Sequence, residues 1–273
     1  MAFVVDDVQR AVRELGLQGQ AICVHSSLRS FGFVEGGARA IVRALLAESC
    51  TVLVPTFSWD GFQAAAPPED RPAHNGADYD WTPASPPRVF TPDVPNIDAD
   101  MGAIPAAVLA MPGHVRGYHP LCSFAAVGQL AAAIVAGQRP DDVFAPLRTL
   151  ASMDGRLVMM GVGLTSMTAL HVAEQLAGRR MFIRWALATD GSVIATENGG
   201  CSEGFEKLAP FLAGLRQVIT VGESAWSVYP ARQTIEAAAA AIQADPRITH
   251  CGREACRCDD AVMGGPVSMR SET

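Results

Sequence analysis

The sequence lacks an excess of positive charge. Its 273 residues include 21 lysines and arginines against 28 aspartates and glutamates, which gives a formal net charge of -7. A protein that binds nucleic acid usually carries a basic patch that meets the phosphates. The charge balance therefore argues against a nucleic-acid partner, and it permits a cationic small-molecule substrate.

Long hydrophobic runs are missing as well. Residues 1–7 show no basic region followed by an apolar core, and no apolar run approaches the roughly 20 residues that a membrane-spanning helix needs. We therefore expect a cytoplasmic protein with no membrane partner. Hydrophobic residues make up 49% of the chain and charged residues 18%, which is typical of a globular protein rather than a disordered one.

Paired Cys-x-x-Cys units are also absent, although the chain has seven cysteines. An odd number without a small secreted framework indicates reduced thiols. Four potential ligands, His250, Cys251, Cys256 and Cys258, fall within nine positions, but their spacing matches no usual zinc pattern. We therefore predict no metal site and interpret these cysteines as free thiols on a surface tail, with metal binding as the alternative.

Apolar strand-like runs alternate with segments of helical periodicity, which favours a layered α/β fold. Asp190-Gly191 is a strong hairpin signal between two strand-like segments, so we expect the sheet to be mixed. We predict one domain over residues 1–263 and a flexible tail over 264–273. The expected strands are 21–25, 51–55, 123–127, 156–160, 181–188 and 192–196, and the expected helices are 6–15, 38–48, 104–110, 129–136, 204–215 and 233–244.

The segment from Asp60 to Asp100 is unusually long for a connection inside a compact domain. It contains eight prolines, eight acidic residues and two arginines, with several aromatic residues between them. Such loops are usually functional. Acids attract a polycation, and aromatic faces cover sugar rings or ammonium groups, so Asp60, Tyr79, Asp98 and Asp100 are candidate substrate residues. The alternative is a solvated proline-rich excursion or a contact between copies of the chain.

The most informative stretch runs from Thr168 to Glu174. It places His171 and Glu174 three residues apart at the start of an expected helix, so both side chains lie on one face. A carboxylate orients an imidazole, fixes its tautomer and stabilises the imidazolium, as a general base requires. The preceding turn, residues 161–167, offers backbone amides to a developing oxyanion. Alternatively, His171 is a core histidine and Glu174 a solvated one.

Two further motifs complete the pattern. Residues 25–32 (HSSLRSFG) leave a strand and supply hydroxyls, amides and a guanidinium suited to phosphates. Residues 115–128 form a second polar turn that feeds a strand. In this order, with Pro55-Thr56-Phe57 and residues 100–105 (DMGAIP) between them and the His171 motif after them, the chain resembles the aminoglycoside 3-N-acetyltransferase family over about residues 5–245.

That resemblance implies transfer of acetyl from acetyl-CoA to the 3-amino group of a 2-deoxystreptamine aminoglycoside, hence antibiotic resistance. It also implies a layered α/β/α domain around a mixed sheet and leaves a homodimer open. His171 and Glu174 correspond to the catalytic pair, Thr168 to an oxyanion donor, and His119 to a neighbour in the same cleft. The acetyl-CoA site corresponds to Ser26, Ser27, Leu28, Arg29, Ser30, Phe31 and Gly32, with Arg116 and Ser123 beside them.

The sequence departs from the family pattern in two places. Ala106 and Ala107 stand where members usually carry glutamate, and Cys122 precedes Ser123 where many have histidine. An acetyl-CoA-dependent transferase of another small amine therefore stays open. So do an acyl-enzyme on Cys122, a hydrolase with Ser26 or Cys122 as nucleophile, and a non-enzymatic binding protein, although no nucleophile-elbow pattern stands out.

Overall fold

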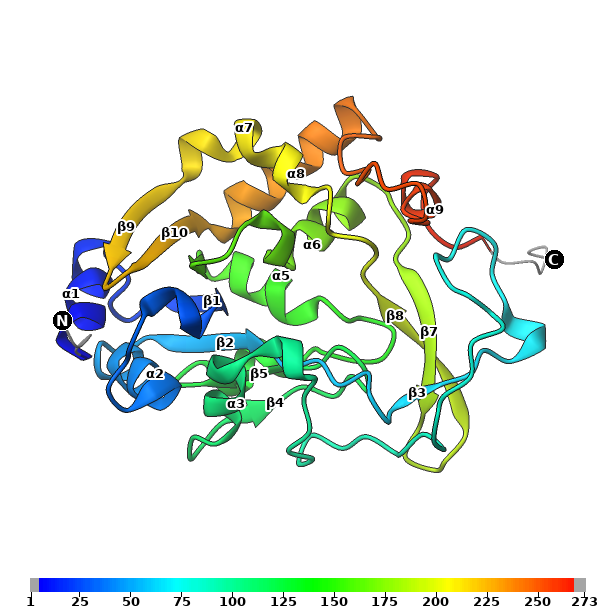
Figure 1. Ribbon diagram of the computed structural model, residues 1–273, viewed down its shortest axis with the longest axis horizontal. Helices are drawn as coiled ribbons and strands as arrows, with labels where there is room; N and C mark the ends of the chain where they lie inside the picture. Colours follow the sequence, from blue (N-terminus) through cyan, green and yellow to red (C-terminus); the bar gives the residue numbers. More distant parts are fainter. Residues whose placement is uncertain (1–4, 268–273) are drawn as a thin grey trace.

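A mixed seven-stranded sheet forms the centre of the molecule, whose computed structural model describes residues 5–267 (Figure 1). The strand order is β4-β5-β2-β1-β6-β10-β9. β1 is parallel to β2 and β6, and every other neighbouring pair is antiparallel. The strands are β1 (Ala21–Ser26), β2 (Thr51–Pro55), β4 (Val115–Arg116), β5 (Phe124–Val127), β6 (Arg156–Met160), β9 (Gln217–Val221) and β10 (Ser224–Pro230).

Alternation along the strands supplies two hydrophobic cores, one on each face of the sheet. In β1, Ile22 and Val24 belong to the core beneath the first three helices, whereas Ala21 and Cys23 belong to the other. This arrangement confirms the predicted layered α/β/α fold. One face is covered by α1 (Val5–Glu14), α2 (Gly37–Ala47) and α3 (Ala103–Leu109), and the other by α4 (Ala131–Val135), α5 (Ala145–Ser152), α6 (Ala169–Leu176) and α8 (Ala231–Ala244).

The hairpin predicted at Asp190-Gly191 exists, but it lies outside the central sheet. β7 (Phe182–Leu187) and β8 (Val193–Asn198) pair with the short β3 (Gln63–Ala64) in a separate three-stranded sheet. The antiparallel part of the central sheet comes instead from β4, β5, β9 and β10. The sequence analysis identified neither β9 nor β10 as a strand, and it did not identify α5.

The single helix expected over residues 204–215 is wrong. The chain forms a 3-10 turn, a short α-helix and another 3-10 turn: η5 (Phe205–Leu208), α7 (Ala209–Leu212) and η6 (Ala213–Leu215). Pro210 has no amide hydrogen to donate, and Gly214 is a poor helix former, so a continuous helix is disfavoured here.

The long acidic segment is largely packed rather than solvated. Phe62 and Phe90 are fully buried and meet edge to face, with ring centroids 5.8 Å apart. Asn75 exchanges two side-chain hydrogen bonds with the backbone of Ile183 on β7. The segment also holds β3 and the 3-10 turns η2 (Pro68–Asp70) and η3 (Ala99–Met101). It therefore lies against the β7–β8 hairpin.

The C-terminal segment follows the short helix α9 (Asp259–Val262). The first part of the predicted flexible tail is held by backbone hydrogen bonds, since Val267 and Ala73 exchange two of them and the Arg180 amide donates to Gly264. Positions 268–273 of that tail lie outside the described residues. Between residues 5 and 267, no helix is both long and apolar enough to cross a membrane.

Candidate functional site

His171 and Glu174 lie on the first turns of α6 and contact each other directly. The Nδ1 atom of His171 is 2.7 Å from Oε2 of Glu174. An ionised carboxylate can only accept hydrogen bonds, so this contact assigns the proton to Nδ1 and leaves the lone pair on Nε2. The structure thus brings the predicted pair together in the arrangement that a general base requires.

Glu174 is itself held by a buried arginine. Its Oε1 accepts a hydrogen bond of 2.7 Å from Arg179, whose guanidinium also donates to Thr249 Oγ1 at 2.7 Å and to the carbonyl of Pro246. Glu174 is 2% exposed and Arg179 8%. A carboxylate buried this deeply is costly without a partner, and the guanidinium offsets that cost.

The imidazole of His171 is enclosed on three sides. Phe144 stacks on it with centroids 5.6 Å apart, and Phe205 meets it edge to face at 5.0 Å. Gly199 covers a third side so closely that an added Cβ would lie 2.8 Å from Nε2. Packing therefore fixes the ring plane, and position 199 has no room for a side chain.

A cavity of about 520 Å³ opens at His171. Hydroxyls, aromatic rings and backbone line it, which is typical of a site for small molecules. Among the described residues of its wall, Asp100 is the one acid. The lining residues are Val24, His25, Ser26, Pro55, Phe57, Trp59, Asp100, Met101, Pro105, Cys122, Phe144, Val162, Thr165, Ser166, Thr168, His171, Gly199, Gly200 and Ser202.

Of the residues expected to bind acetyl-CoA, Ser26 lines this cavity. Phe31 is 1% exposed and packs on Trp226, and Gly32 packs against the carboxylate of Glu223. Ser30 Oγ is hydrogen-bonded to Ser224 Oγ at 2.7 Å. Buried contacts therefore leave Phe31 as a core residue, contrary to its expected role. The remaining residues, Ser27, Leu28 and Arg29, begin the 3-10 turn η1 (Leu28–Phe31), with Arg29 exposed.

Arg116 and Ser123 have a structural role that differs from the expected one. The Arg116 guanidinium donates to the carbonyls of Val94, Asn96 and Thr56 at 2.6 to 3.0 Å and to Ser123 Oγ at 2.9 Å. Burial lowers the pKa of Arg116 to about 10. The guanidinium thus clamps the long segment to β2 and β5, which uses the donors that a phosphate would need.

His119 is fully buried and does not line the cavity. Its Nδ1 accepts the amides of Leu121 and Cys122 at 3.3 and 2.8 Å, and its Nε2 lies 2.9 Å from the carbonyl of Glu197. Burial lowers the pKa of His119 to about 4. Both ring nitrogens are therefore occupied by backbone groups, which corrects the expected place of His119 in the cleft.

Cys122 does reach the cavity wall, but its thiol donates to Asn198 Oδ1 at 3.1 Å. Burial raises the pKa of Cys122 well above its ordinary value, so the thiol is not activated as a nucleophile.

The four expected substrate residues do not converge. Asp100 lines the cavity, whereas Asp98 accepts the backbone amides of Trp59 and Asp60 at 2.8 and 3.1 Å. Burial raises the pKa of Asp98. The Asp60 side chain is exposed. Tyr79 donates to the carbonyl of Pro72 and meets the Trp185 ring edge to face, outside the cavity wall.

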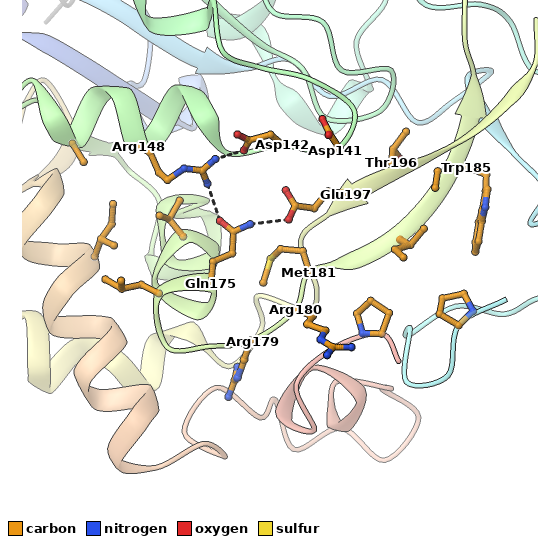
Figure 2. Close-up of a pocket in the computed structure, with 18 of the residues that line it drawn as sticks. Asp141, Asp142, Arg148, Gln175, Arg179, Arg180, Met181, Trp185, Thr196 and Glu197 are labelled. Atoms are coloured by element: carbon orange, nitrogen blue, oxygen red, sulfur yellow. Dashed lines mark hydrogen bonds and ion pairs between the residues drawn. The ribbon is translucent and has the colours of Figure 1, made fainter. Parts of the chain in front are cut away.

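A second and larger hollow, of about 1280 Å³, lies beside a different face of α6 (Figure 2). Its wall includes Val172, Gln175 and Arg179, which have helical spacing, and Trp185 of β7. Arg148 and Gln175 are hydrogen-bonded at 2.9 Å, and Gln175 donates to Glu197 at 2.9 Å. His171 and Thr168 do not line this hollow. The residues with transfer chemistry therefore gather at the smaller cavity.

Three residues of the smaller cavity were not predicted: His25, Trp59 and Gly199. Burial lowers the pKa of His25 to about 4, so its ring is neutral near pH 7. His25 opens the 25–32 motif and could have been chosen from it. Trp59 immediately precedes the acidic segment. Nothing local distinguishes Gly199, because its closeness to His171 depends on how β8 ends.

The chain matches the family described as aminoglycoside 3-N-acetyltransferase over residues 23–243. It is 33% identical over 184 residues to aminoglycoside N(3)-acetyltransferase IX of Micromonospora chalcea, covering 63% of this chain and 62% of that one. Identity to aminoglycoside N(3)-acetyltransferase VII of Streptomyces paromomycinus is 34% over 175 residues, covering 62% and 59%. The match thus spans about three fifths of these relatives.

Solved structures share the fold. Aminoglycoside acetyltransferase AAC(3)-IVa superposes with a TM-score of 0.77 at 23% identity, covering 97% of this chain and 98% of that one. AAC(3)-Xa gives 0.71 at 25% identity, covering 88% and 92%. AAC-IIIb, solved with CoASH, gives 0.74 at 22% identity, covering 89% and 97%. This chain belongs to the aminoglycoside 3-N-acetyltransferase family.

Proposed function

We propose that this protein transfers the acetyl group of acetyl-CoA to the 3-amino group of a 2-deoxystreptamine aminoglycoside and thereby gives antibiotic resistance. The observation that carries the proposal is the His171–Glu174 pair, 2.7 Å apart at the wall of a cavity, in a chain of this family. We further propose that residues 1–263 act as one domain. A cytoplasmic location and a homodimer stay predictions.

The chemistry needs a base because an ammonium has no lone pair with which to attack. Nε2 of His171 takes one proton as the amine nitrogen attacks the thioester carbonyl. The new C–N bond forms, the C–S bond breaks, and the CoA sulfur leaves as a thiolate that is then protonated. Glu174 holds the Nδ1 proton and stabilises the imidazolium, and Thr168 with the turn before it faces the developing oxyanion.

The two substrates are assigned to different walls. We propose that Ser26 and the start of η1, together with Thr165 and Ser166, face acetyl-CoA, since hydroxyls and amides suit its phosphates. Asp100 and Trp59 suit a cationic sugar, because the carboxylate attracts an ammonium and the ring covers a sugar face.

One observation favours a second acceptor, a smaller amine. Pro105 lines the cavity, and Ala106 and Ala107 follow it where family members usually carry glutamate. With Asp100 as the single acid among the described wall residues, a polycation has fewer anchors than its several ammonium groups could use.

The test is a panel of acceptors with purified protein. Release of free thiol from acetyl-CoA is followed with 2-deoxystreptamine aminoglycosides and, in parallel, with simple diamines and amino sugars. We expect turnover with aminoglycosides and a product that gains one acetyl group on the 3-amino nitrogen by mass spectrometry and NMR. Turnover confined to simple amines would replace the acceptor, and acetyl-CoA cleavage that is equally fast without any amine would indicate a hydrolase.

A further inference from the structure

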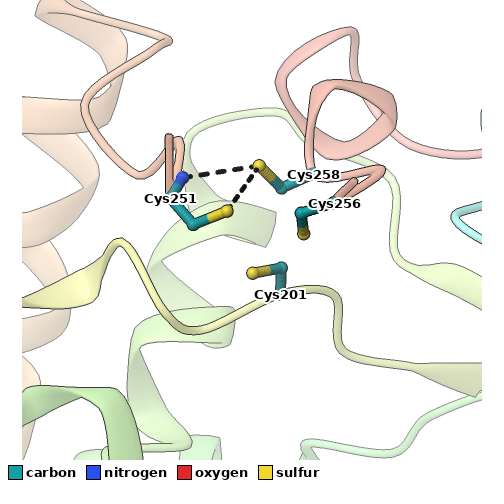
Figure 3. A group of neighbouring side chains, drawn as sticks. All are labelled: Cys201, Cys251, Cys256 and Cys258. Carbon is teal, nitrogen blue, oxygen red and sulfur yellow. Dashed lines mark hydrogen bonds between the residues drawn. The ribbon is translucent and has the colours of Figure 1, made fainter. Parts of the chain in front are cut away.

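We propose that Cys201, Cys251, Cys256 and Cys258 bind a structural zinc ion. Their sulfur atoms all lie within 4.8 Å of one another. Figure 3 shows Cys201 on the chain that follows β8, facing three cysteines from the loop that precedes α9. The four thiols thus come from two segments that are distant in the sequence.

The spacing of the sulfurs fits one tetrahedral ion. Zinc–sulfur bonds of about 2.3 Å place neighbouring sulfurs of a tetrahedron about 3.8 Å apart. The Sγ atoms of Cys251 and Cys258 are 3.5 Å apart, and all four cysteines are reduced. That separation is far longer than the roughly 2.05 Å of a disulfide. An iron–sulfur cluster, with several irons and sulfides between the thiolates, would require wider spacing.

Backbone amides already point at two of the sulfurs. The Cys251 amide donates to Cys258 Sγ and the Arg253 amide donates to Cys251 Sγ, each at 3.4 Å. Gly252, with φ of 78°, makes the tight turn that aims the Arg253 amide. Such hydrogen bonds stabilise thiolates and orient metal ligands. The loop is therefore shaped as a ligand loop and not only crowded with cysteines.

This site corrects the interpretation of the cysteines as free thiols on a surface tail. The sequence analysis grouped three of them with His250, but His250 Nε2 lies 3.2 Å from Asp259, and its Nδ1 accepts the Gly252 amide at 3.0 Å. The fourth ligand is Cys201, which lies in another part of the chain. A set drawn from two segments has no short spacing to recognise.

Four thiolates leave no open position on zinc, so the ion has a structural role and takes no part in the transfer. It would tie the cavity wall to the C-terminal segment, since Gly199, Gly200 and Ser202 of that wall flank Cys201. The same two segments are joined by the ion pair of Glu203 and Arg253 at 2.7 Å. The C-terminal segment also carries Thr249, which accepts from Arg179 behind Glu174.

The first experiment measures zinc and iron together, by elemental analysis of tag-free protein purified with reductant from zinc-supplemented cells. We expect about one zinc per chain in the wild type and less than about a tenth of that in the double variant Cys251→Ser with Cys258→Ser. Cys50→Ser is the matched control and should keep its zinc, because Cys50 is buried elsewhere, with its thiol on the Leu17 carbonyl.

Cobalt provides a second measurement that needs no variant. Wild-type protein is stripped with a chelator under reductant and given Co²⁺, whose absorption reports thiolate ligands and tetrahedral geometry. We expect intense sulfur-to-cobalt charge transfer, abolished when zinc is restored. The proposal would be overturned by a wild type that holds neither zinc nor cobalt, by iron in place of zinc, or by equal zinc in the double variant.

A third measurement addresses the tie itself. Hydrogen exchange of wild type with and without zinc should show faster exchange over residues 199–203 and 246–258 after metal removal, with β1 unchanged. Unchanged exchange in both segments would overturn the structural role. None of these readouts uses acetyl transfer, so their failure is distinct from failure of the proposed function.

Discussion

His171 and His119 show how surroundings decide what one residue type can do. His171 has a carboxylate on Nδ1 and a cavity at its ring, whereas His119 has backbone groups on both nitrogens and no exposed surface. A histidine bonded to a carboxylate can gain and lose a proton during a reaction. One enclosed by backbone is held neutral and contributes to stability instead.

The largest effect should come from removing the base. We expect His171→Ala to lower kcat by about 10²- to 10⁴-fold, because general base catalysis typically contributes that much. Binding of acetyl-CoA, measured by calorimetry, should stay within a few-fold of wild type. His114→Ala is the control, since His114 hydrogen-bonds to the Met111 carbonyl away from the cavity and should leave kcat unchanged.

Replacing the carboxylate sharpens the comparison from the other side. Glu174→Gln keeps the shape but cannot stabilise an imidazolium, and we expect kcat to fall by about 10²- to 10³-fold. The change also leaves Arg179 without its countercharge, so the melting temperature should fall. Steady-state kinetics and thermal melts check the two effects, and an unchanged kcat would remove Glu174 from the mechanism.

Acid should destabilise the protein through the buried neutral histidines. Burial lowers the pKa of His119 and of His25 to about 4, below the value near 6.5 of an unfolded chain. Between these values the unfolded state binds more protons, so stability rises with pH. The contribution is complete above pH 6.5 and is lost as the pH falls toward 4, by about 3 kcal/mol for each histidine. Urea unfolding at stepped pH measures it.

His119→Gln should separate stability from activity. The amide replaces part of the hydrogen-bonding of the ring, so we expect a loss of about 1 to 3 kcal/mol in the free energy of unfolding at pH 7.5. The dependence of stability on pH should become shallower, since one titrating group is gone. Turnover per folded molecule should stay within a few-fold of wild type.

The smallest effect concerns Cys122. Its thiol donates to Asn198 and its pKa is raised, so it does not serve as an acetyl carrier. Cys122→Ser keeps a donor at that position and should change kcat by less than about twofold. A trapped acetyl group on Cys122, found by mass spectrometry after acetyl-CoA alone, would contradict this assignment.

The sequence was informative where the determining contacts are local. His171 and Glu174 are three residues apart on one helix, so helical geometry alone predicts that they meet. Alternating apolar segments likewise predicted the layered fold. The mixed sheet was expected on a hairpin that in fact lies outside it, because hairpin signals do not show which sheet a hairpin joins.

Contacts between distant segments could not be read in the same way. Arg116 has the residue type of a phosphate ligand, yet its donors meet carbonyls of a segment some twenty positions earlier. Cys201 joins three cysteines about fifty positions later. Both outcomes depend on how loops return to the sheet, which neither periodicity nor spacing encodes.

The most direct test compares the two histidines in one assay. Thiol release from acetyl-CoA is measured with a 2-deoxystreptamine aminoglycoside for wild type, His171→Ala and His119→Gln at equal concentrations of folded protein. Rapid turnover by wild type and His119→Gln, with His171→Ala at least about 10²-fold slower, is the predicted result. Turnover by His171→Ala close to that of wild type would contradict the assignment of His171 as the base.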